Sequence, residues 1–181
     1  MHIPIKYVPN FLDNPLDVAD VLWNELSWLR HDKVPRSEYY CNELNVVYKY
    51  GIEKYARTYL PQSWHPQILA IKKQLEEFTN IKFEVCFLNG YSDQSDHLGW
   101  HADDSPEMDD SRPIAIVSLG VEREIWFKEN NSEEVYKHLL QNGSLCLMCS
   151  GMQDTHKHRI PKASFTCGKR ISLTFRGYKD V

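Results

Sequence analysis

The sequence lacks the features of a membrane-bound or secreted chain. No apolar run approaches the roughly 20 residues that a transmembrane helix needs. The first residues, from Met1 to Tyr7, lack the basic start and the apolar stretch of a signal peptide. We therefore expect no association with a membrane and a location in the cytoplasm or the nucleus. A chain of 181 residues suits one ordinary domain with one core, so we expect a single domain covering residues 1–181.

Cysteine is scarce as well, with five residues scattered along the chain. An odd, scattered set does not match the paired framework of a disulfide-rich fold. Cys146 and Cys149 form a CxxC pair, but no second pair is present to complete a zinc site. Both lie in the apolar run 144–149, so we interpret them as small core residues of a buried strand.

The chain also lacks an excess of positive charge. Its 21 Lys and Arg residues stand against 25 Asp and Glu residues, which gives a formal net charge of −4. Strong non-specific binding to duplex DNA depends on neutralising phosphates, so this balance argues against it, although a local basic face is not excluded. Aromatic residues make up 12% of the sequence, which suits a pocket for a flat substrate.

Two amphipathic helices are predicted in the first half of the chain, over residues 15–29 and 67–78. In both segments, apolar residues recur at helical spacing. Asn14 is expected to cap the first helix, and Pro15 suits its first position. We expect the apolar stripe of each helix to pack on the core.

The pattern changes to strands after residue 81. Apolar and polar residues alternate over 83–87, while 114–119 is a continuous apolar run typical of a buried strand. A shorter strand is indicated at 125–127. Residues 136–140 are ambiguous, because they fit either a strand or the continuation of a helix. The coarse prediction is an α+β protein in which two N-terminal helices back an all-β core.

Tyrosine is concentrated between the two predicted helices. Residues 34–61 contain six of the ten tyrosines of the chain. The segment has no helical or strand periodicity over its whole length, so it is interpreted as short hairpins or as a lid. For each single tyrosine, packing in the core is the simpler interpretation.

A candidate metal site begins at His101-Ala102-Asp103. In extended backbone, residues two apart point to the same side, so the imidazole and the carboxylate lie together. One distant histidine would complete a facial triad of two imidazoles and one carboxylate. Such a triad leaves positions open on iron(II) for a co-substrate and oxygen. The third ligand is expected from His156 or His158, and spacing alone does not choose between them.

The C-terminal segment 170–176 has strict strand alternation, with apolar residues on one face and polar residues on the other. The polar face consists of Arg170, Ser172, Thr174 and Arg176. Two arginines on one face suit a short dicarboxylate, because the planar guanidinium group matches carboxylate geometry. The alternative is a solvent-exposed face with two surface arginines. Asn89 and Tyr91 also share a face and can hydrogen-bond a carboxylate, although Asn89-Gly90 fits a simple turn equally well.

Together these segments resemble the AlkB family of alkylation-repair dioxygenases. The matching segments are Asn89-Gly90-Tyr91, 96–104, 113–120, His158-Arg159-Ile160-Pro161 and 170–176. Their order and spacing agree with those of the family over about half of the chain. Pro35-Arg36, the tyrosine-rich segment and Trp64 are similar, more loosely, to the nucleotide-recognition lid of the family and its flank. The resemblance implies a double-stranded β-helix, or jelly roll, in which residues 136–140 form a strand.

The resemblance also implies a set of site residues. It implies His101, Asp103 and His158 as iron ligands, because Arg-Ile-Pro follows His158 as in the family. It implies that the 2-oxoglutarate site consists of Asn89, Tyr91, Arg170, Ser172, Thr174 and Arg176. It implies that residues 34–61 form a lid, and the candidate substrate residues are Arg36, Tyr39, Tyr40, Tyr48, Trp100 and Ser105. Two positions depart from the family, since residue 172 is usually asparagine and residue 105 is usually acidic.

The function implied by the resemblance is oxidative demethylation of N-alkylated bases in nucleic acid, as in DNA or RNA repair. Iron(II) and 2-oxoglutarate would be required together with O2, and the partner would be alkylated single-stranded DNA or RNA bound by a monomer. Two alternatives belong to other classes. One is a 2-oxoglutarate-dependent hydroxylase of a protein side chain or a small molecule, and the other is a β-sandwich binding module without catalysis.

Overall fold

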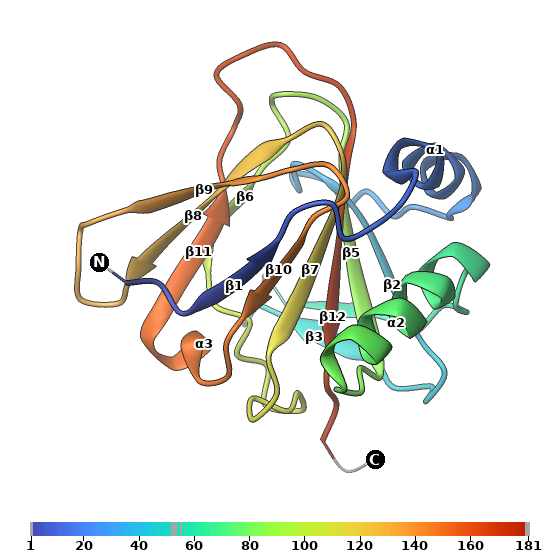
Figure 1. Ribbon diagram of the computed structural model, residues 1–181, viewed down its shortest axis with the longest axis horizontal. Helices are drawn as coiled ribbons and strands as arrows, with labels where there is room; N and C mark the ends of the chain where they lie inside the picture. Colours follow the sequence, from blue (N-terminus) through green and yellow to red (C-terminus); the bar gives the residue numbers. More distant parts are fainter. Residues whose placement is uncertain (1, 52–53, 55, 180–181) are drawn as a thin grey trace.

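The computed structural model describes residues 2–51, 54 and 56–179 and is built mostly from strands. Figure 1 shows the strands gathered in the middle of the molecule, with two longer helices on one side. The helices are α1 (Pro15–Glu25), α2 (Pro66–Thr79) and α3 (Met152–Thr155). The strands are β1 (Ile5–Val8), β2 (Ser37–Asn42), β3 (Tyr48–Tyr50), β4 (Arg57–Tyr59), β5 (Val85–Tyr91), β6 (Leu98–His101), β7 (Ile114–Gly120), β8 (Arg123–Glu129), β9 (Tyr136–Leu140), β10 (Leu145–Met148), β11 (His156–Ile160) and β12 (Arg170–Arg176).

The larger sheet has six strands in the order β1-β10-β7-β12-β5-β2. Strand β12 lies inside this sheet and pairs antiparallel with β5 along its whole length, from Arg170 opposite Tyr91 to Arg176 opposite Val85. On its other side β12 pairs antiparallel with β7. Residues 170–176 therefore form a buried strand inside the sheet. The polar face of this strand is not exposed to solvent.

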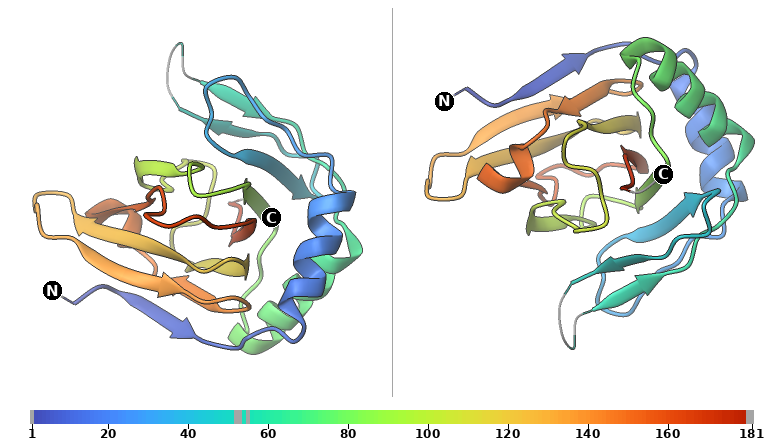
Figure 2. Two further views of the ribbon diagram at one scale, coloured as in Figure 1. Left: turned by 90° about the horizontal axis from the view of Figure 1, so that it is seen from above. Right: turned by 90° about the horizontal axis from the view of Figure 1, so that it is seen from below.

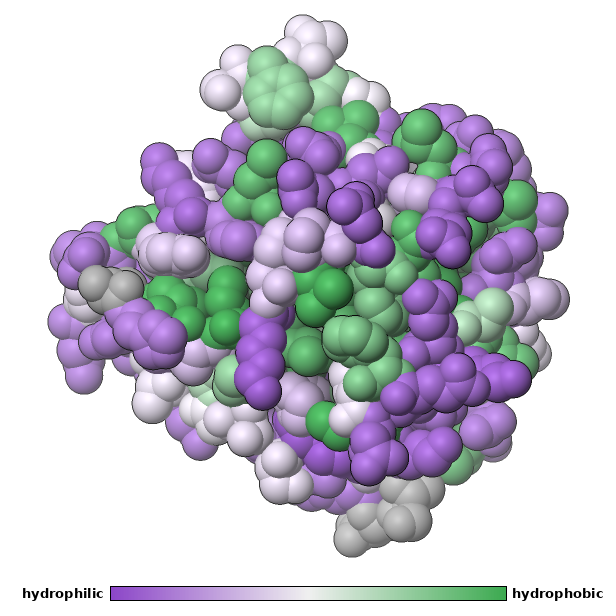
Figure 3. Space-filling model, viewed as in Figure 1, coloured by the Kyte–Doolittle hydropathy of each residue, from purple (hydrophilic) through white to green (hydrophobic). Residues whose placement is uncertain are grey.

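A second sheet of four strands has the order β6-β11-β8-β9, and β3 and β4 form a separate two-stranded hairpin. Residues 136–140 form strand β9, as the resemblance implied and against the helical alternative. Figure 2 shows the helices α1 and α2 along one side of the molecule and the hairpin β3–β4 projecting at one end. On the face drawn in Figure 3, hydrophilic residues cover most of the surface and hydrophobic residues appear in patches between them.

Both predicted N-terminal helices are present, with corrected ends. Helix α1 ends at Glu25 rather than at residue 29, because Leu26 takes an extended conformation with ψ of 141°. Contrary to the expectation, the side chain of Asn14 does not cap α1. Its backbone is left-handed, with φ of 50°, whereas a capping side chain is presented from the extended region. Helix α2 begins one residue earlier than predicted, and the Nδ1 atom of His65 accepts a hydrogen bond from the backbone of Gln67 at 3.1 Å.

The main core lies between these helices and the larger sheet. Apolar residues of β12 meet apolar residues of both helices there, among them Leu173, Leu22 and Ile68, each with an exposed fraction of 0%. The alternation predicted over 83–87 is only partly observed, because Cys86 is also fully buried. A strand covered on both faces has no side for solvent-exposed residues, which explains the difference.

Strand β10 contains Cys146, which is fully buried, and Cys149 follows the strand in a half-buried position. All five cysteines are free, as expected from their scattered positions. No helix within the described residues is both long and apolar enough to cross a membrane.

The central position of β12 predicts a large stability effect. Leu173→Ala should lower the free energy of unfolding by about 2–5 kcal/mol, because it leaves a cavity in a close-packed interior. Leu69→Ala is the matched control, since Leu69 is 46% exposed on α2, and its effect should stay within about 0.5 kcal/mol. Urea unfolding followed by circular dichroism measures both values. Equal effects would contradict the assigned core.

Candidate active site

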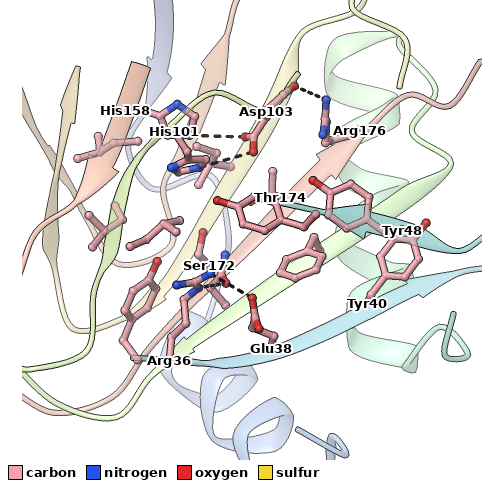
Figure 4. Close-up of a pocket in the computed structure, with 18 of the residues that line it drawn as sticks. Arg36, Glu38, Tyr40, Tyr48, His101, Asp103, His158, Ser172, Thr174 and Arg176 are labelled. Atoms are coloured by element: carbon pink, nitrogen blue, oxygen red, sulfur yellow. Dashed lines mark hydrogen bonds and ion pairs between the residues drawn. The ribbon is translucent and has the colours of Figure 1, made fainter. Parts of the chain in front are cut away.

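A cavity lies between the two sheets and is lined by side chains from both of them. The larger sheet contributes residues of β2, β5, β7 and β12, and the smaller sheet contributes residues of β6, β8, β9 and β11. The hairpin β3–β4 adds Tyr48 and Tyr50 at one side. Figure 4 shows the lining side chains pointing into a shared space, with His101, Asp103 and His158 at one end of it.

Two neighbouring strands bring the two histidines together. His101 ends β6, His158 is in β11, and the antiparallel register places these residues directly opposite each other. Their ring centroids are 4.2 Å apart. The Nε2 atom of His101 lies 3.6 Å from one carboxylate oxygen of Asp103, and the Nε2 atom of His158 lies 3.5 Å from the other. One potential ligand atom from each residue lies within 4.8 Å of the others, so the three residues could hold one metal ion.

Burial of His101 and the groups around Asp103 give these two residues the protonation states that a metal ligand needs. Loss of solvation, together with the neighbouring His158, lowers the pKa of His101 to about 4. Burial alone would raise the pKa of Asp103, but the contact with His158 and the electrostatic influence of the surrounding groups, Arg176 among them, outweigh it and bring that pKa well below its usual range. The site therefore presents a neutral imidazole and a carboxylate near neutral pH, as divalent metal binding requires.

His156, the alternative third ligand, lies elsewhere. Its side chain is buried, and its Nδ1 atom is 2.7 Å from the hydroxyl of Thr155. It does not line the cavity. His158 is thus the histidine of this pair that lies beside His101 and Asp103.

Backbone contacts fix the loop that follows His101. The backbone N–H of Asp103 donates to the side-chain oxygen of Gln153 on α3 at 2.9 Å. Arg176 donates from its guanidinium group to the carbonyl oxygen of Asp103. Sequence analysis gave Gln153 no role, because a single glutamine before His156 carries no motif or periodicity. Its contact nevertheless holds the backbone of Asp103.

All four polar residues of β12 line the cavity, together with Asn89 and Tyr91 of β5. Arg170 and Arg176 are buried, with exposed fractions of 1% and 4%. The Nε atom and one terminal nitrogen of each guanidinium group have no hydrogen-bond partner within the described part of the chain. Unpaired buried donors of this kind are costly, so a cavity that contains four of them fits an anionic ligand.

The side chain of Arg170 stays positively charged although it is buried in the cavity. Its guanidinium group donates to the hydroxyl of Ser118 at 3.0 Å and lies over the ring of Tyr91, 5.2 Å from the centroid. Burial lowers the pKa of Arg170 to about 10, which leaves the side chain protonated near neutral pH. A carboxylate would therefore find a charged donor here.

Asn89 is held by a buried network that sequence analysis did not find. The Nε atom of Arg36 donates to its side-chain oxygen at 3.0 Å, and a terminal nitrogen of Arg36 donates to Glu38 at 3.2 Å. Tyr59 donates to the other oxygen of Glu38 at 2.8 Å. Glu38 is 1% exposed, and Figure 4 shows it beside Arg36 at the end of the cavity away from His158. A single glutamate in a tyrosine-rich segment gives no sequence signal for such a role.

The tyrosine-rich segment is divided between the cavity and the core. Tyr40 and Tyr48 line the cavity, while Tyr39 packs in the core and donates its hydroxyl to the carbonyl of Ser63 at 3.0 Å. Ser105 donates to the hydroxyl of Tyr48 at 3.1 Å. Burial raises the pKa of Tyr48 to about 12, so its hydroxyl stays protonated.

Trp100, the remaining candidate substrate residue, does not line the cavity. It lies beside Arg159, whose guanidinium carbon is 4.9 Å from the centroid of its ring. Of the six expected substrate residues, the cavity brings together Arg36, Tyr40 and Tyr48, and Ser105 joins them through Tyr48.

Comparison with known proteins agrees with this geometry. Residues 11–176 match the model of the 2OG-Fe(II) oxygenase superfamily. The chain is 32% identical to alpha-ketoglutarate-dependent dioxygenase alkB homolog 3 of Bos taurus over 170 residues, which cover 87% of this chain and 57% of that protein. It is 31% identical to DNA oxidative demethylase ALKBH2 of Mus musculus over 152 residues, which cover 79% of this chain and 62% of that protein.

A solved structure, titled "The structure of OsALKBH1", is similar with a TM-score of 0.67 and 18% identity, covering 97% of this chain and 99% of that one. That likeness concerns the fold. The chain spans 57% of the length of the first of the curated relatives it matches. On the match to the superfamily model, the similarity to AlkB homologues and the His-Asp-His cluster, the chain belongs to the AlkB family of the 2OG-Fe(II) oxygenase superfamily.

Proposed function

We propose that the protein is an oxidative demethylase of N-alkylated bases in nucleic acid that depends on iron(II) and 2-oxoglutarate. The observation that carries the proposal is the position of two groups in one cavity. A cluster of two histidines and one aspartate lies at one end, and β12 of the other sheet contributes two buried arginines, each with donors that have no partner within the described residues. A metal and a dicarboxylate can therefore be held side by side, as this chemistry requires.

For the fold we propose a double-stranded β-helix, or jelly roll. The proposal is supported by a six-stranded and a four-stranded antiparallel sheet that both contribute to one cavity. Two facing sheets with an interior ligand site are typical of this architecture.

We propose His101, Asp103 and His158 as the iron ligands. Three ligands from the protein leave positions for a co-substrate and O2. When bound together, iron(II), 2-oxoglutarate and O2 would supply oxidative chemistry in which one oxygen atom enters succinate as CO2 is released and the other hydroxylates a C–H bond of the substrate. Within the protein, Gln153 keeps Asp103 in position through the backbone contact at 2.9 Å. A hydroxylated N-methyl group would then leave the base as formaldehyde.

We propose that Arg170 and Arg176 bind the carboxylates of 2-oxoglutarate, because their unpaired donors need anionic partners. Ser172, Thr174 and Tyr91 supply hydroxyl groups along the same wall. Asn89 contributes through its amide, whose oxygen is already held by Arg36. Enclosing the co-substrate between two sheets excludes bulk water from the reacting groups.

We propose that the alkylated base lies against Tyr40 and Tyr48, with Arg36 and Ser105 at its edges and residues 34–61 as the lid. Aromatic walls suit a flat base that has left its stack. Single-stranded DNA or RNA is the expected partner of a monomeric enzyme. The free thiols of all five cysteines fit a reducing compartment such as the cytoplasm or the nucleus.

The metal assignment predicts which histidine is essential. His158→Ala should weaken binding of Co(II), used as an oxygen-stable substitute for iron(II), by more than about 100-fold, since even outer contacts of a metal site are worth 10- to 100-fold. His156→Ala is the matched control and should retain most of the affinity. Titration of each purified variant with Co(II), followed by visible absorption, measures this. Loss in His156→Ala with full binding by His158→Ala would show that the wrong histidine was chosen.

The co-substrate assignment predicts the effect of Arg176. Arg176→Ala should weaken 2-oxoglutarate binding by roughly 10- to 150-fold, the equivalent of a charge-assisted contact of about 1.5–3 kcal/mol. Arg176→Lys should restore only part of the affinity, because a point charge does not reproduce the guanidinium fork. Calorimetry on the Mn(II)-loaded protein without oxygen measures both. Arg30→Lys, in a side chain that contacts Asp96 outside the cavity, is the control. Unchanged affinity in both Arg176 variants would refute the assignment.

The function itself is tested by release of formaldehyde from oligonucleotides that contain 1-methyladenine or 3-methylcytosine. Single strands should react faster than matched duplexes, because an unstacked base avoids the few kcal/mol of flipping. Asp103→Ala is the inactive control. If no oligonucleotide yields formaldehyde while 2-oxoglutarate is still consumed, the protein is a hydroxylase of a protein side chain or a small molecule instead.

A further inference from the structure

The outer face of the four-stranded sheet has a row of alternating cationic and aromatic side chains. The row contains one residue from each strand, and its members are Lys137 of β9, Trp126 of β8, Arg159 of β11 and Trp100 of β6. Lys137 lies 4.2 Å from the centroid of the Trp126 ring, and the guanidinium carbon of Arg159 lies 4.3 Å from the same ring. Arg159 is also 4.9 Å from the ring of Trp100, so both indoles contact it.

Strand register explains why these side chains share one face. Trp126 is paired with Lys137 on one side and with Arg159 on the other. Successive residues of a strand point to opposite faces. His158 and Phe127, the immediate neighbours of Arg159 and Trp126, are buried inside the protein. The row therefore lies on the reverse side of the strands whose inner face contains the His101 and His158 side chains.

Two further lysines extend this surface. Lys128 and Lys157 are paired across β8 and β11 and lie next to the row on the same face. The amino group of Lys128 is 5.1 Å from the centroid of the Trp100 ring. The surface defined by the row and these two lysines is called the basic outer face below.

The charge of this face is opposite to that of the whole protein. The protein has a net charge of −4. The basic residues of the face are Lys128, Lys137, Lys157 and Arg159. None of them has an ion pair with a carboxylate within the described residues. Glu124, near the start of β8, is acidic, and its carboxylate accepts a hydrogen bond from the indole of Trp126 at 2.7 Å. A local excess of unpaired cations on an acidic protein suits a polyanion.

The row also restricts Arg159. Its guanidinium group lies between two indole rings, and its Nε atom is buried without a hydrogen-bond partner within the described residues. An arginine that is already held in place loses less conformational freedom when it binds an anion. The cations occupy positions over the indole rings, so those rings are not free platforms for stacking bases. The face is suited to phosphate groups rather than to base recognition.

The position of the face relative to the cavity indicates which polyanion it binds. Strand β6 is an edge strand of its sheet, and its residues Leu98 and His101 line the cavity. Trp100, between them in sequence, belongs to the outer face. A chain that passed around the edge of β6 would therefore reach Trp100 and Arg159 from the cavity. Adjacent strands lie about 4.8 Å apart, so the row extends the binding surface by roughly 14 Å beyond the cavity.

We propose that the basic outer face binds the phosphate backbone of the nucleic-acid strand whose alkylated base occupies the cavity. The inference rests on the proposed function and adds where the strand runs. Binding there is independent of base sequence, because the contacts are between phosphates and cations. It depends on strand length, because a very short oligonucleotide reaches the cavity but not the row.

The test compares oligonucleotides of two lengths. Fluorescence anisotropy measures the affinity of the Mn(II)-loaded protein for a methylated trinucleotide and for a methylated 12-residue single strand. In the native protein the longer strand should bind more tightly. The double variant Lys128→Ala/Lys157→Ala should weaken binding of the longer strand by on the order of tenfold at low salt. The slope of log affinity against log salt should also decrease by about 1.4, from about 0.7 for each lost phosphate contact on a single strand.

The matched control is Lys6→Ala/Lys73→Ala. It removes the same charge from exposed positions on β1 and α2, outside the basic outer face. The control should retain the native length dependence and salt slope. Thermal unfolding of all three proteins verifies that each is folded.

Three outcomes would overturn the inference. They are equal losses in the control and in the double variant, affinity independent of strand length in the native protein, and equally tight binding of an acidic peptide through the same two lysines. Formaldehyde release from the trinucleotide separates this inference from the proposed function. If the native protein demethylates the trinucleotide but the double variant binds the longer strand normally, only the assignment of the outer face fails. If no oligonucleotide is demethylated, the proposed function fails.

Discussion

The alternation of side chains along β12 is the constraint on which both the core and the cavity depend. Apolar residues such as Leu173 face the helices, and the intervening polar residues face the cavity. Because the strand has neighbours on both sides, a shift of one residue in its register would exchange the two sets. The shift would place Arg170 and Arg176 in the core, where no anion can reach them. The same pairing that stabilises the protein therefore also fixes the positions of Arg170 and Arg176 in the cavity.

Buried charged residues are concentrated around the cavity, and the free-energy cost of burying them has to be offset by nearby groups. For Glu38 the protein itself provides these groups, because Arg36 and the hydroxyl of Tyr59 both donate to its carboxylate. Arg170 and Arg176 are different, because the Nε atom and one terminal nitrogen of each have no hydrogen-bond partner within the described residues. Removal of one partner from a buried charged pair costs far more than the pair contributes. An anion that enters the cavity would relieve this cost, so ligand binding and stability are coupled here.

Sequence alone predicted those parts of the site that have a short-range pattern. The strand at 170–176 and the pair His101 and Asp103 were found because a period of two determines which side chains point the same way. The network around Glu38 was not found, because it depends on residues of different strands meeting in three dimensions. Trp100 was expected in the cavity but lies outside it. The sequence shows that this aromatic residue is next to His101, but it does not show to which face of the sheet its side chain points. The end of α1 was misplaced because apolar spacing continues beyond the last helical residue.

The strand that ends in His101 is short and lies at the edge of its sheet. Strand β6 has four residues, and its register with β11 is irregular between His158 and Ile160. A free edge normally exposes a row of backbone N–H and C=O groups that can pair with a strand of another molecule. Four residues with an uneven register make a poor template for such pairing. The sheet edge that contains His101 is therefore a poor site for pairing with a strand of another molecule.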